Sequence, residues 1–568
     1  MSTPPFPRSL AARAILPAAI FLVPFLVFLA GPPSGSGDTE PAELLPISIL
    51  LDHRLDFDRF YGGLQDLPYP YRRVRGRVVS AYPIVAGLAN VPVYAAARIF
   101  GTDLYAARSR LSHVTSAFLA AASVLFLYGT LRRVCRSRAE ALLFAAVYAF
   151  GTEVLAVASR GAWQHAPSLF FLCASLWLLW PGTAAEPPGR ESDGRDPVWR
   201  VSLSGLTLAL AVVSRPTNVL LALAAAAFVL ARRRRQFPPF LLFAAIPAVA
   251  VTLYSAVRLA NPLAMGQLYR PFGFGGHSLR GLAGLLASPS RGLFVFSPVL
   301  LASLPGAWVA WRSRGRRRYE PLPWLASGAA ATLLLFSYWG MWWGGSSFGY
   351  RLVLDVVPVL TILSAVGWGL FDRGGGGRAR GRVFLFAALL AISVYVEILG
   401  VFAYPTRFGE GLDLEPERLW RVRESELVLA SRQLFHREVS PRGREVAAVW
   451  WTSGKNDDTI PGWIDQSPGS RTIRGAVSVS GWAKASAGEV EVAIAFDGGP
   501  VVRPQRYPRP DVAAVLPELG DTATTGFRAE VSAPAGPVRD RAMTVELKEP
   551  GGRVRRLGPI RFRWGPAF

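Results

Sequence analysis

Eleven apolar runs, separated by clusters of arginine, constrain the fold of this 568-residue chain more than any other feature. A helix needs about 20 consecutive apolar residues to cross the hydrocarbon core of a bilayer, and hydrophobic residues make up 51% of the sequence. The pattern predicts a polytopic α-helical membrane protein. The eleven predicted spans are residues 11–30, 107–130, 139–157, 166–181, 201–214, 216–231, 238–257, 293–311, 321–341, 352–371 and 383–403.

The arginine clusters orient these spans. The formal net charge is +23, and most clusters lie between apolar runs. With the N-terminus in the cytoplasm, Arg132–Arg138, Arg232–Arg235, Arg312–Arg318 and Arg373–Arg382 all fall on the cytoplasmic side, as the positive-inside rule requires. Arg72–Arg77, in the first outer loop, is the exception. The distribution predicts a multi-pass protein of the inner (plasma) membrane with an extracytoplasmic C-terminal domain, and it explains the basic charge without a nucleic-acid partner.

Two apolar segments allow another interpretation. Residues 82–101 are apolar enough to suggest a span, but counting them would place the later arginine clusters outside. We therefore expect a helix on the outer membrane surface there. Residues 11–30 could form a cleaved signal peptide, although the length of the run and the lack of a clear cleavage signal favour a retained helix.

The composition changes after the last apolar run. Residues 477–482 and 489–496 alternate with a period of two, and turn signals such as Asp497-Gly498-Gly499 separate such stretches. About seven short strands predict a β-sandwich. The predicted domains are a transmembrane domain (residues 1–403), an extracytoplasmic connecting segment (404–470) and a β-sandwich (471–568).

Acidic residues follow the first span, in the outer loop at residues 31–106. Asp38, Glu40 and Asp52 would lie at the membrane surface, near lipid headgroups. One carboxylate there could act as a general base, and a second could orient it or help to bind a divalent metal ion. The alternative is that these are ordinary loop acids, because Asp and Glu also favour helix starts.

Basic and aromatic residues are predicted on the same side of the membrane. Arg72 and Arg73 have the guanidinium groups that suit phosphate, although they could also contact anionic lipid. Trp163 and His165, between the third and fourth spans, could bind a phosphate or a sugar, or be ordinary interfacial residues.

Two further outer loops carry candidates. His277 and Arg291 lie before the eighth span, and Arg351 closes the glycine-rich stretch Gly344–Arg351 before the tenth. Glycines there allow a tight turn and the close approach of a ligand. The sequence contains no motif for ATP, a nicotinamide cofactor or zinc.

The order of these motifs resembles the GT-C superfamily of membrane glycosyltransferases, which includes the protein O-mannosyltransferases and the lipid A aminoarabinose transferases. Asp38-Thr39-Glu40-Pro41 resembles the acidic motif after the first span of that family, although Thr39 departs from the common Asp-Glu pair. The other matching segments are Ser48–Asp56, Ser80–Pro83 with the helix after it, Trp163–His165, Ser214–Asn218, Ser288–Leu293 and Gly344–Arg351.

The resemblance implies a polyprenyl-phosphate-linked sugar as donor and an inverting transfer, on the outer face, to a lipid, glycan or protein acceptor. Carried over, Asp38 is the expected base, with Glu40 second. Tyr82 and the Arg and His residues of the outer loops would bind the donor. The tail from Tyr507 to Phe527 resembles Ig-like modules attached to bacterial glycan enzymes.

A transporter or lipid flippase is the alternative function. Such proteins usually carry charged residues near the membrane midplane, on broken helices. Here Glu153, Asp355 and Glu397 are the clearest acidic residues within predicted spans, and all three could lie near helix ends. This favours the transferase.

The topology makes a direct prediction. A reporter that is active only outside the cytoplasm should be active when it is fused after Phe568 and inactive when it is fused after Arg235. The opposite pair of results would contradict the eleven-span arrangement.

Overall fold

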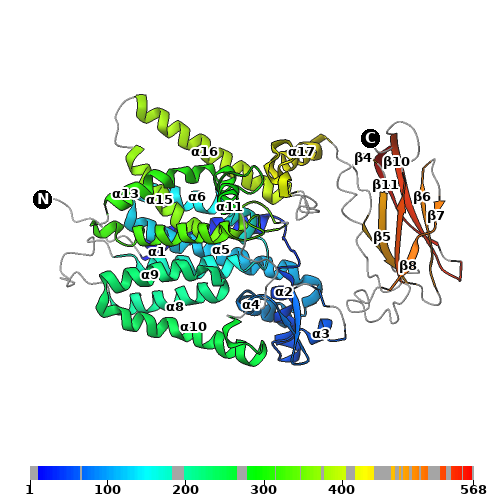
Figure 1. The fold of residues 1–568 in the computed structure, drawn as a ribbon, viewed down its shortest axis with the longest axis horizontal. Helices are drawn as coiled ribbons and strands as arrows, with labels where there is room; N and C mark the ends of the chain where they lie inside the picture. Colours follow the sequence, from blue (N-terminus) through cyan, green and yellow to red (C-terminus); the bar gives the residue numbers. More distant parts are fainter. Residues whose placement is uncertain are drawn as a thin grey trace. The chain divides into compact units, whose positions relative to one another are not determined.

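The computed structural model divides into two units (Figure 1). The helical unit comprises residues 1–59 and 67–435, and the β unit comprises 60–66 and 436–568. The residues that the structure describes are 10–63, 67–68, 70–181, 197–264, 278–313, 315–345, 347–371, 377–404, 416–439, 462–466, 472–474, 477–484, 489–497, 501–508, 525–532, 539–552 and 554–565.

Every apolar run that was predicted to span the membrane contains helix. The elements in these runs are α1 (Leu10–Ala30), α5 (Leu104–Val134), α6 (Arg138–Phe150) with η1 (Val154–Ala158), α7 (His165–Leu179), α8 (Val198–Ser214), η2 (Pro216–Asn218) with α9 (Val219–Arg232), α10 (Phe237–Arg258), α12 (Leu293–Phe296) with η5 (Pro298–Ala302) and α13 (Ser303–Arg312), α14 (Leu322–Ser337), η7 (Arg351–Val356) with α15 (Val357–Phe371), and α16 (Gly377–Phe402).

Length and composition support a membrane protein without fixing the number of spans. Four described segments are long and apolar enough to cross a bilayer: residues 104–134, 234–258, 351–369 and 380–402. Several other apolar helices are shorter. The count of eleven therefore stays a prediction.

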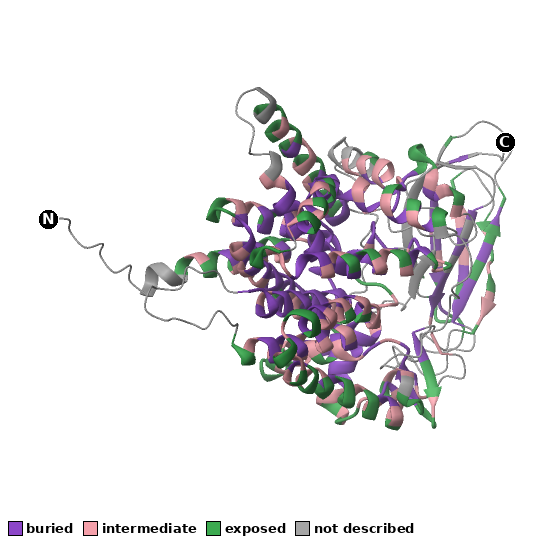
Figure 2. Cartoon of the chain, turned by 60° about the vertical axis from the view of Figure 1, so that its left-hand side comes forward, coloured by how far each residue is buried: buried purple, intermediate pink, exposed green. Residues whose placement is uncertain are grey.

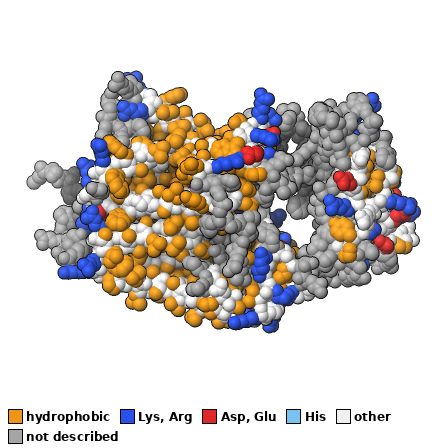
Figure 3. Space-filling view, viewed as in Figure 1, with side chains coloured by type: hydrophobic (Ala, Val, Ile, Leu, Met, Phe, Trp, Pro, Cys, Tyr) orange, Lys and Arg blue, Asp and Glu red, His pale blue; other side chains and the backbone are white. Residues whose placement is uncertain are grey.

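The surface of the helical unit is rich in exposed apolar side chains, as a lipid-facing surface requires. Large apolar side chains stand exposed on α10, including Leu242 (67% exposed) and Leu253 (61%). Hydrophobic side chains cover much of the face seen in Figure 3, while buried residues fill the interior of the helix bundle (Figure 2). Water would disfavour so large an apolar surface, so it indicates contact with lipid.

The first outer loop folds into elements that position the acidic motif. These are α2 (Glu40–Asp52), α3 (Asp58–Tyr61), the antiparallel strands β1 (Tyr71–Val74) and β2 (Arg77–Ser80), and α4 (Val85–Ile99). Helix α4 confirms the helix expected over residues 82–101 and packs against α2 and α5. Its place on the membrane surface stays a prediction. Neither α2 nor the strand pair was predicted.

The β unit consists of two sheets around one core. One sheet has the order β4-β11-β10-β6-β7 and the other β3-β5-β9-β8. The strands are β3 (Gly462–Gln466), β4 (Thr472–Arg474), β5 (Val477–Ala483), β6 (Glu491–Phe496), β7 (Val501–Val502), β8 (Gln505–Tyr507), β9 (Gly526–Val531), β10 (Arg539–Lys548) and β11 (Val554–Gly565).

The core of this unit takes side chains from both sheets. Val479 of β5 and Phe527 of β9 belong to the same apolar cluster as Ile494 of β6 and Met543 of β10. The period-two alternation predicted for residues 477–482 and 489–496 is confirmed in β5 and β6. The Ig-like assignment and the domain boundaries stay predictions; β3 begins before residue 471.

A close helix crossing gives a test of this packing. Helix α13 meets α15 at Gly306, where an added Cβ would overlap the carbonyl of Leu363. We expect Gly306→Ala to lower the melting temperature in detergent by several degrees, because overpacking costs about 1–3 kcal/mol. Gly315→Ala is the matched control, since its Cβ would meet nothing within 4 Å. Equal melting temperatures for the two variants would contradict this packing.

Candidate active site

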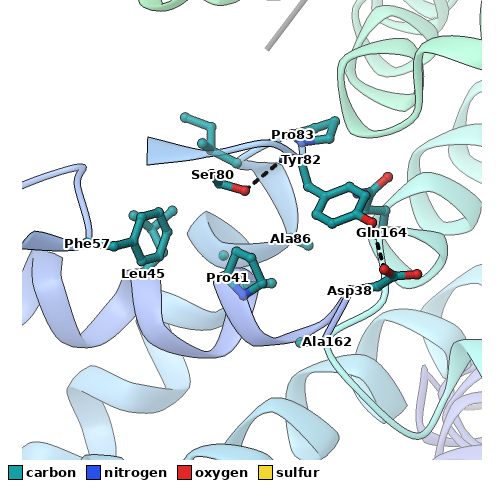
Figure 4. Close-up of a pocket in the computed structure, with 13 residues that line it drawn as sticks. Asp38, Pro41, Leu45, Phe57, Ser80, Tyr82, Pro83, Ala86, Ala162 and Gln164 are labelled. Atoms are coloured by element: carbon teal, nitrogen blue, oxygen red, sulfur yellow. Dashed lines mark hydrogen bonds between the residues drawn. The ribbon is translucent and has the colours of Figure 1, made fainter. Parts of the chain in front are cut away.

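Asp38 is the centre of the candidate site. It lies between α1 and α2, and each of its carboxylate oxygens accepts a hydrogen bond from a distant segment. The Tyr82 hydroxyl donates to Oδ1 over 2.6 Å, and Arg351 Nη1 donates to Oδ2 over 2.9 Å. Figure 4 shows Tyr82 pointing toward Asp38. The structure thus brings together three residues that the sequence predicted for the site, from segments more than 300 positions apart.

Arg351 is held by more than this ion pair. Its Nη2 donates to the Gly344 carbonyl over 2.9 Å, and its guanidinium lies 4.3 Å from the centroid of the Trp163 ring. Its Nε is buried and has no acceptor. Trp163, another predicted site residue, therefore orients Arg351 through a cation–π contact.

A small cavity lies beside Asp38 (Figure 4). Its polar lining comes from Asp38, Ser80, Tyr82 and Gln164, and its apolar lining from residues of α2, α4 and the loops around them. The cavity places a few convergent polar groups against an apolar wall, and at about 10 Å³ it has room for a water molecule.

Glu43 is a buried acid close to Asp38 that sequence reasoning did not single out. The Thr39 hydroxyl accepts a hydrogen bond from the Ser36 N–H, and it lies 2.9 Å from the Ser36 carbonyl and 3.2 Å from Glu43 Oε1. The Thr39 hydroxyl thus has both the Ser36 carbonyl and Glu43 as acceptors, and the Ser36 carbonyl also accepts from the backbone N–H groups of Thr39 and Glu40.

Burial is the main influence on the charge of Glu43. Burial raises the pKa of Glu43 to about 7, against the opposing effect of Arg108, whose Nε lies 3.7 Å from Oε2. Tyr94 of α4 and Tyr105 of α5 are the other titratable side chains that interact with Glu43 from neighbouring helices. A glutamate whose pKa is raised to about 7 therefore lies one helical turn from the acidic motif.

The other predicted acids lie differently. Glu40 is the half-buried first residue of α2. Asp52 is the last, about 20 Å along the helix axis from the start of α2. Arg59 donates to both oxygens of Asp52, over 2.7 and 2.6 Å, and this lowers the pKa of Asp52. Asp52 does not line the cavity beside Asp38.

Arg72 and Arg73 are exposed on strand β1. Arg72 Nη1 donates to the carbonyl of Tyr71 over 2.7 Å. Asp58 fixes the strand pair, because it accepts from the Val78 N–H (2.8 Å) and from Arg77 (2.6 Å). Neither Arg72 nor Arg73 lines the cavity, so their binding to a phosphate stays a prediction.

His165 faces a buried polar network instead of Asp38. Arg215 Nη1 lies 2.9 Å from His165 Nδ1 and also forms an ion pair with Asp355. A guanidinium can only donate, so Nδ1 accepts and the imidazole proton is assigned to Nε2. The Ser168 hydroxyl donates to Asp355 over 2.6 Å, and Asn218 donates to Ser168 over 2.7 Å.

This network supports the site indirectly. Asp355 and Arg351 lie on the same short helix, η7, and His165 begins α7 two residues after Trp163. The Arg215–Asp355 pair therefore fixes the two segments that carry Trp163 and Arg351. Arg215 was not predicted as a site residue; the signal was a charge at the junction of two apolar runs.

The guanidinium of Arg291 donates hydrogen bonds to acceptors within the protein. It is 1% exposed, and it donates to the carbonyls of Trp343 (3.0 Å), Ser290 (2.7 Å) and Gly345 (3.0 Å) and to Glu426 Oε2 (2.6 Å). This geometry holds the loop before Arg351. Its predicted contact with the donor is untested, and His277 lies outside the described residues.

Glu426, on α17 (Glu426–Val439), was also missed from sequence. It is fully buried and accepts from the Gly349 N–H over 2.9 Å. Burial raises the pKa of Glu426 to about 7, opposed by Arg291. No feature of the local sequence separates it from the other charged residues around it.

The residues present do not fit a divalent metal ion. Among the residues that the structure describes, no group of three or more His, Cys, Asp or Glu side chains could hold one. Both oxygens of Asp38 are already bonded, to Tyr82 and to a cation, Arg351. The metal ion that the sequence left open therefore has no site here among the described residues.

Comparisons with known proteins add a distant similarity. No family model matches the chain, and no curated protein matches it. Three solved structures of an oligosaccharyltransferase from Archaeoglobus fulgidus are similar: one tethered to an acceptor peptide, one with an inhibitory peptide and a dolichol-phosphate, and one with zinc and sulfate.

The identities are 12%, 13% and 15%, and the TM-scores are 0.41, 0.37 and 0.34. The matches cover 80%, 81% and 80% of this chain and 62%, 62% and 60% of those chains. The chain thus spans less than two thirds of the proteins it matches. Such values identify neither a substrate nor a catalytic residue here.

Glu43 gives a pH-dependent prediction. Its pKa is raised to about 7 in the folded protein, so between the ordinary value of 4.5 and about 7 the folded chain binds a proton that the unfolded chain has lost. Glu43 therefore makes the free energy of unfolding fall as pH rises through this window, by up to about 3 kcal/mol. Glu43→Gln should become more stable relative to the unsubstituted protein as pH rises from 4.5 to 7. Melting curves with a pH-independent difference would contradict this.

Proposed function

We propose that the protein is a membrane glycosyltransferase of the GT-C type, which moves a sugar from a polyprenyl-phosphate carrier to an extracytoplasmic acceptor. The observation that carries this is the placement of Asp38. A carboxylate in the loop after the first apolar helix meets a guanidinium and a tyrosine hydroxyl beside a small cavity. Base, phosphate ligand and positioning groups are what a transfer from an activated phosphate donor requires.

The reaction would use Asp38 as general base. A hydroxyl or amine of the acceptor attacks the anomeric carbon, and the bond from that carbon to the donor phosphate breaks. Asp38 takes the acceptor's proton, while the polyprenyl phosphate leaves with the bonding electron pair. Attack opposite the leaving group inverts the anomeric centre. The Tyr82 hydroxyl, at 2.6 Å, holds Asp38 in place.

The guanidinium of Arg351 would neutralise the leaving phosphate. Arginine binds phosphate through two parallel donors, and Trp163 keeps the guanidinium plane fixed. The donor's lipid tail would lie along the apolar surface of the bundle. The acceptor would reach the site from the extracytoplasmic side.

Transport fits the geometry less well than transfer. Asp355 pairs with Arg215. Glu153 accepts from the Tyr350 N–H and Glu397 from the Ala156 N–H over 3.2 Å, each on one oxygen only, since Glu153 Oε2 and Glu397 Oε1 have no hydrogen-bond partner among the described residues. A carrier instead needs polar groups that bind and release a substrate. We therefore favour the transferase over the flippase.

Asp38→Asn tests the proposal. It keeps the hydrogen bond from Tyr82 but removes the base, so sugar transfer in membranes should fall by about 10² to 10⁴-fold. The assay follows transfer from a panel of radiolabelled polyprenyl-phosphate sugars to endogenous acceptors. Glu417→Gln is the matched control, because this exposed carboxylate of the same unit forms an ion pair with Arg280 at the surface. Full transfer by Asp38→Asn, with normal membrane insertion, would remove Asp38 as the base.

A further inference from the structure

We infer that the Asp38–Arg351 ion pair is a latch that the donor's phosphate opens. In the arrangement observed, Arg351 neutralises the carboxylate that is meant to take a proton. When a phosphate group binds, the guanidinium transfers to it and Asp38 gains basicity. The inference rests on the proposed function and adds to it an order of events: donor binding precedes activation of the base.

The hydrogen bonds of Arg351 show why the closed arrangement is a resting state. Nη1 donates to Asp38 and Nη2 donates to the Gly344 carbonyl, but Nε is buried without an acceptor. A buried donor left without a partner costs about 1–3 kcal/mol. Exchange of Asp38 leaves Nε as it is and changes only the bond of Nη1, for which a phosphate offers more acceptor oxygens than a carboxylate.

The hydrogen bonds of Asp38 show why the closed arrangement is a poor catalyst. A carboxylate that accepts from a guanidinium at 2.9 Å and a phenol at 2.6 Å is stabilised in its charged form. Both contacts oppose protonation, and the cation contributes more because it adds an opposite charge. Loss of Arg351 leaves the Tyr82 contact in place, so Asp38 stays oriented while its affinity for a proton rises.

A phosphate group matches what Arg351 offers. The edge formed by Nη1 and Nη2 is a fork that can bind two phosphate oxygens, and Nη1 is the donor that Asp38 now occupies. The Trp163 ring, 4.3 Å from the guanidinium, and the Gly344 carbonyl can keep the side chain close while Asp38 is released. Opening therefore requires only a small displacement of a side chain that is 12% exposed.

Coupling between the two residues is the testable consequence. The probe is farnesyl phosphate, and the measurement is its dissociation constant for the purified full-length protein and for Asp38→Asn, Arg351→Gln and the double variant. Arg351→Gln should weaken binding at least about tenfold. Asp38→Asn should tighten binding by a similar factor, because the phosphate no longer competes for the guanidinium. In the Arg351→Gln background Asp38→Asn should have no effect.

The double variant separates the latch from simple repulsion. If Asp38 only repelled the phosphate, Asp38→Asn would tighten binding equally with and without Arg351, and the latch would be wrong. Weaker or unchanged binding by Asp38→Asn would also overturn it. Arg280→Gln, an exposed arginine paired with Glu417, controls for general loss of charge and should bind normally.

Two further measurements keep the outcomes distinct. Melting curves of each variant identify misfolding, and Arg351→Lys provides a second substitution. Lysine retains a point charge for Asp38 but lacks the fork, so it should also weaken farnesyl phosphate binding. If the unsubstituted protein transfers sugar but the effects of Asp38→Asn and Arg351→Gln on farnesyl phosphate binding are additive, the latch is wrong and the proposed function stands. No binding of farnesyl phosphate would reject the latch, while the transfer assay decides the proposed function separately.

Discussion

The contact between Asp38 and Arg351 is the interaction on which the site depends, because it closes a loop of 313 residues. Asp38 follows α1 directly, and Arg351 begins η7 between α14 and α15. Their meeting requires that the helices between them pack in one arrangement. The aromatic face of Trp163 and the hydroxyl of Tyr82 complete the contact from two more segments.

Two buried ion pairs make that arrangement rigid. Arg215 with Asp355 fixes η7 beside α7, and Arg291 with Glu426 fixes the loop that precedes η7. Burying a charged pair contributes little net stability, but removing one partner is strongly destabilising because the other stays buried. These pairs therefore restrict the positions of Arg351 and Trp163 more than they stabilise the fold. The same principle explains why Arg291, predicted as a ligand, has its donors engaged by the protein.

Sequence reasoning located the helices because apolar runs of this length have few alternatives. It also selected Asp38, Tyr82, Trp163 and Arg351, which the structure brings together. It could not show that Asp52, on the same loop, lies at the far end of a helix and is paired with Arg59. Helix α2 was missed because its apolar residues show no amphipathic period and Pro46 lies among them.

The residues that were missed share a physical reason. The roles of Glu43, Arg215 and Glu426 depend on burial or on partners far away in the sequence. No local sequence pattern indicates burial of a charged residue or a distant partner. Asp38-Thr39-Glu40-Pro41 resembled an acidic motif, but only the structure shows that Glu43 is buried and that its Oε1 accepts from the Thr39 hydroxyl over 3.2 Å. His165 was predicted to bind a phosphate or a sugar because of its position in the sequence, but in the structure its Nδ1 faces Arg215.

The most direct test of this account is an experimental structure with a non-hydrolysable polyprenyl-phosphonate sugar bound. The account predicts phosphonate oxygens within hydrogen-bonding distance of Arg351, the anomeric carbon facing Asp38, and Asp38 still bonded to Tyr82 but separated from Arg351. A phosphonate group bound away from Arg351, with the Asp38–Arg351 pair intact, would contradict it.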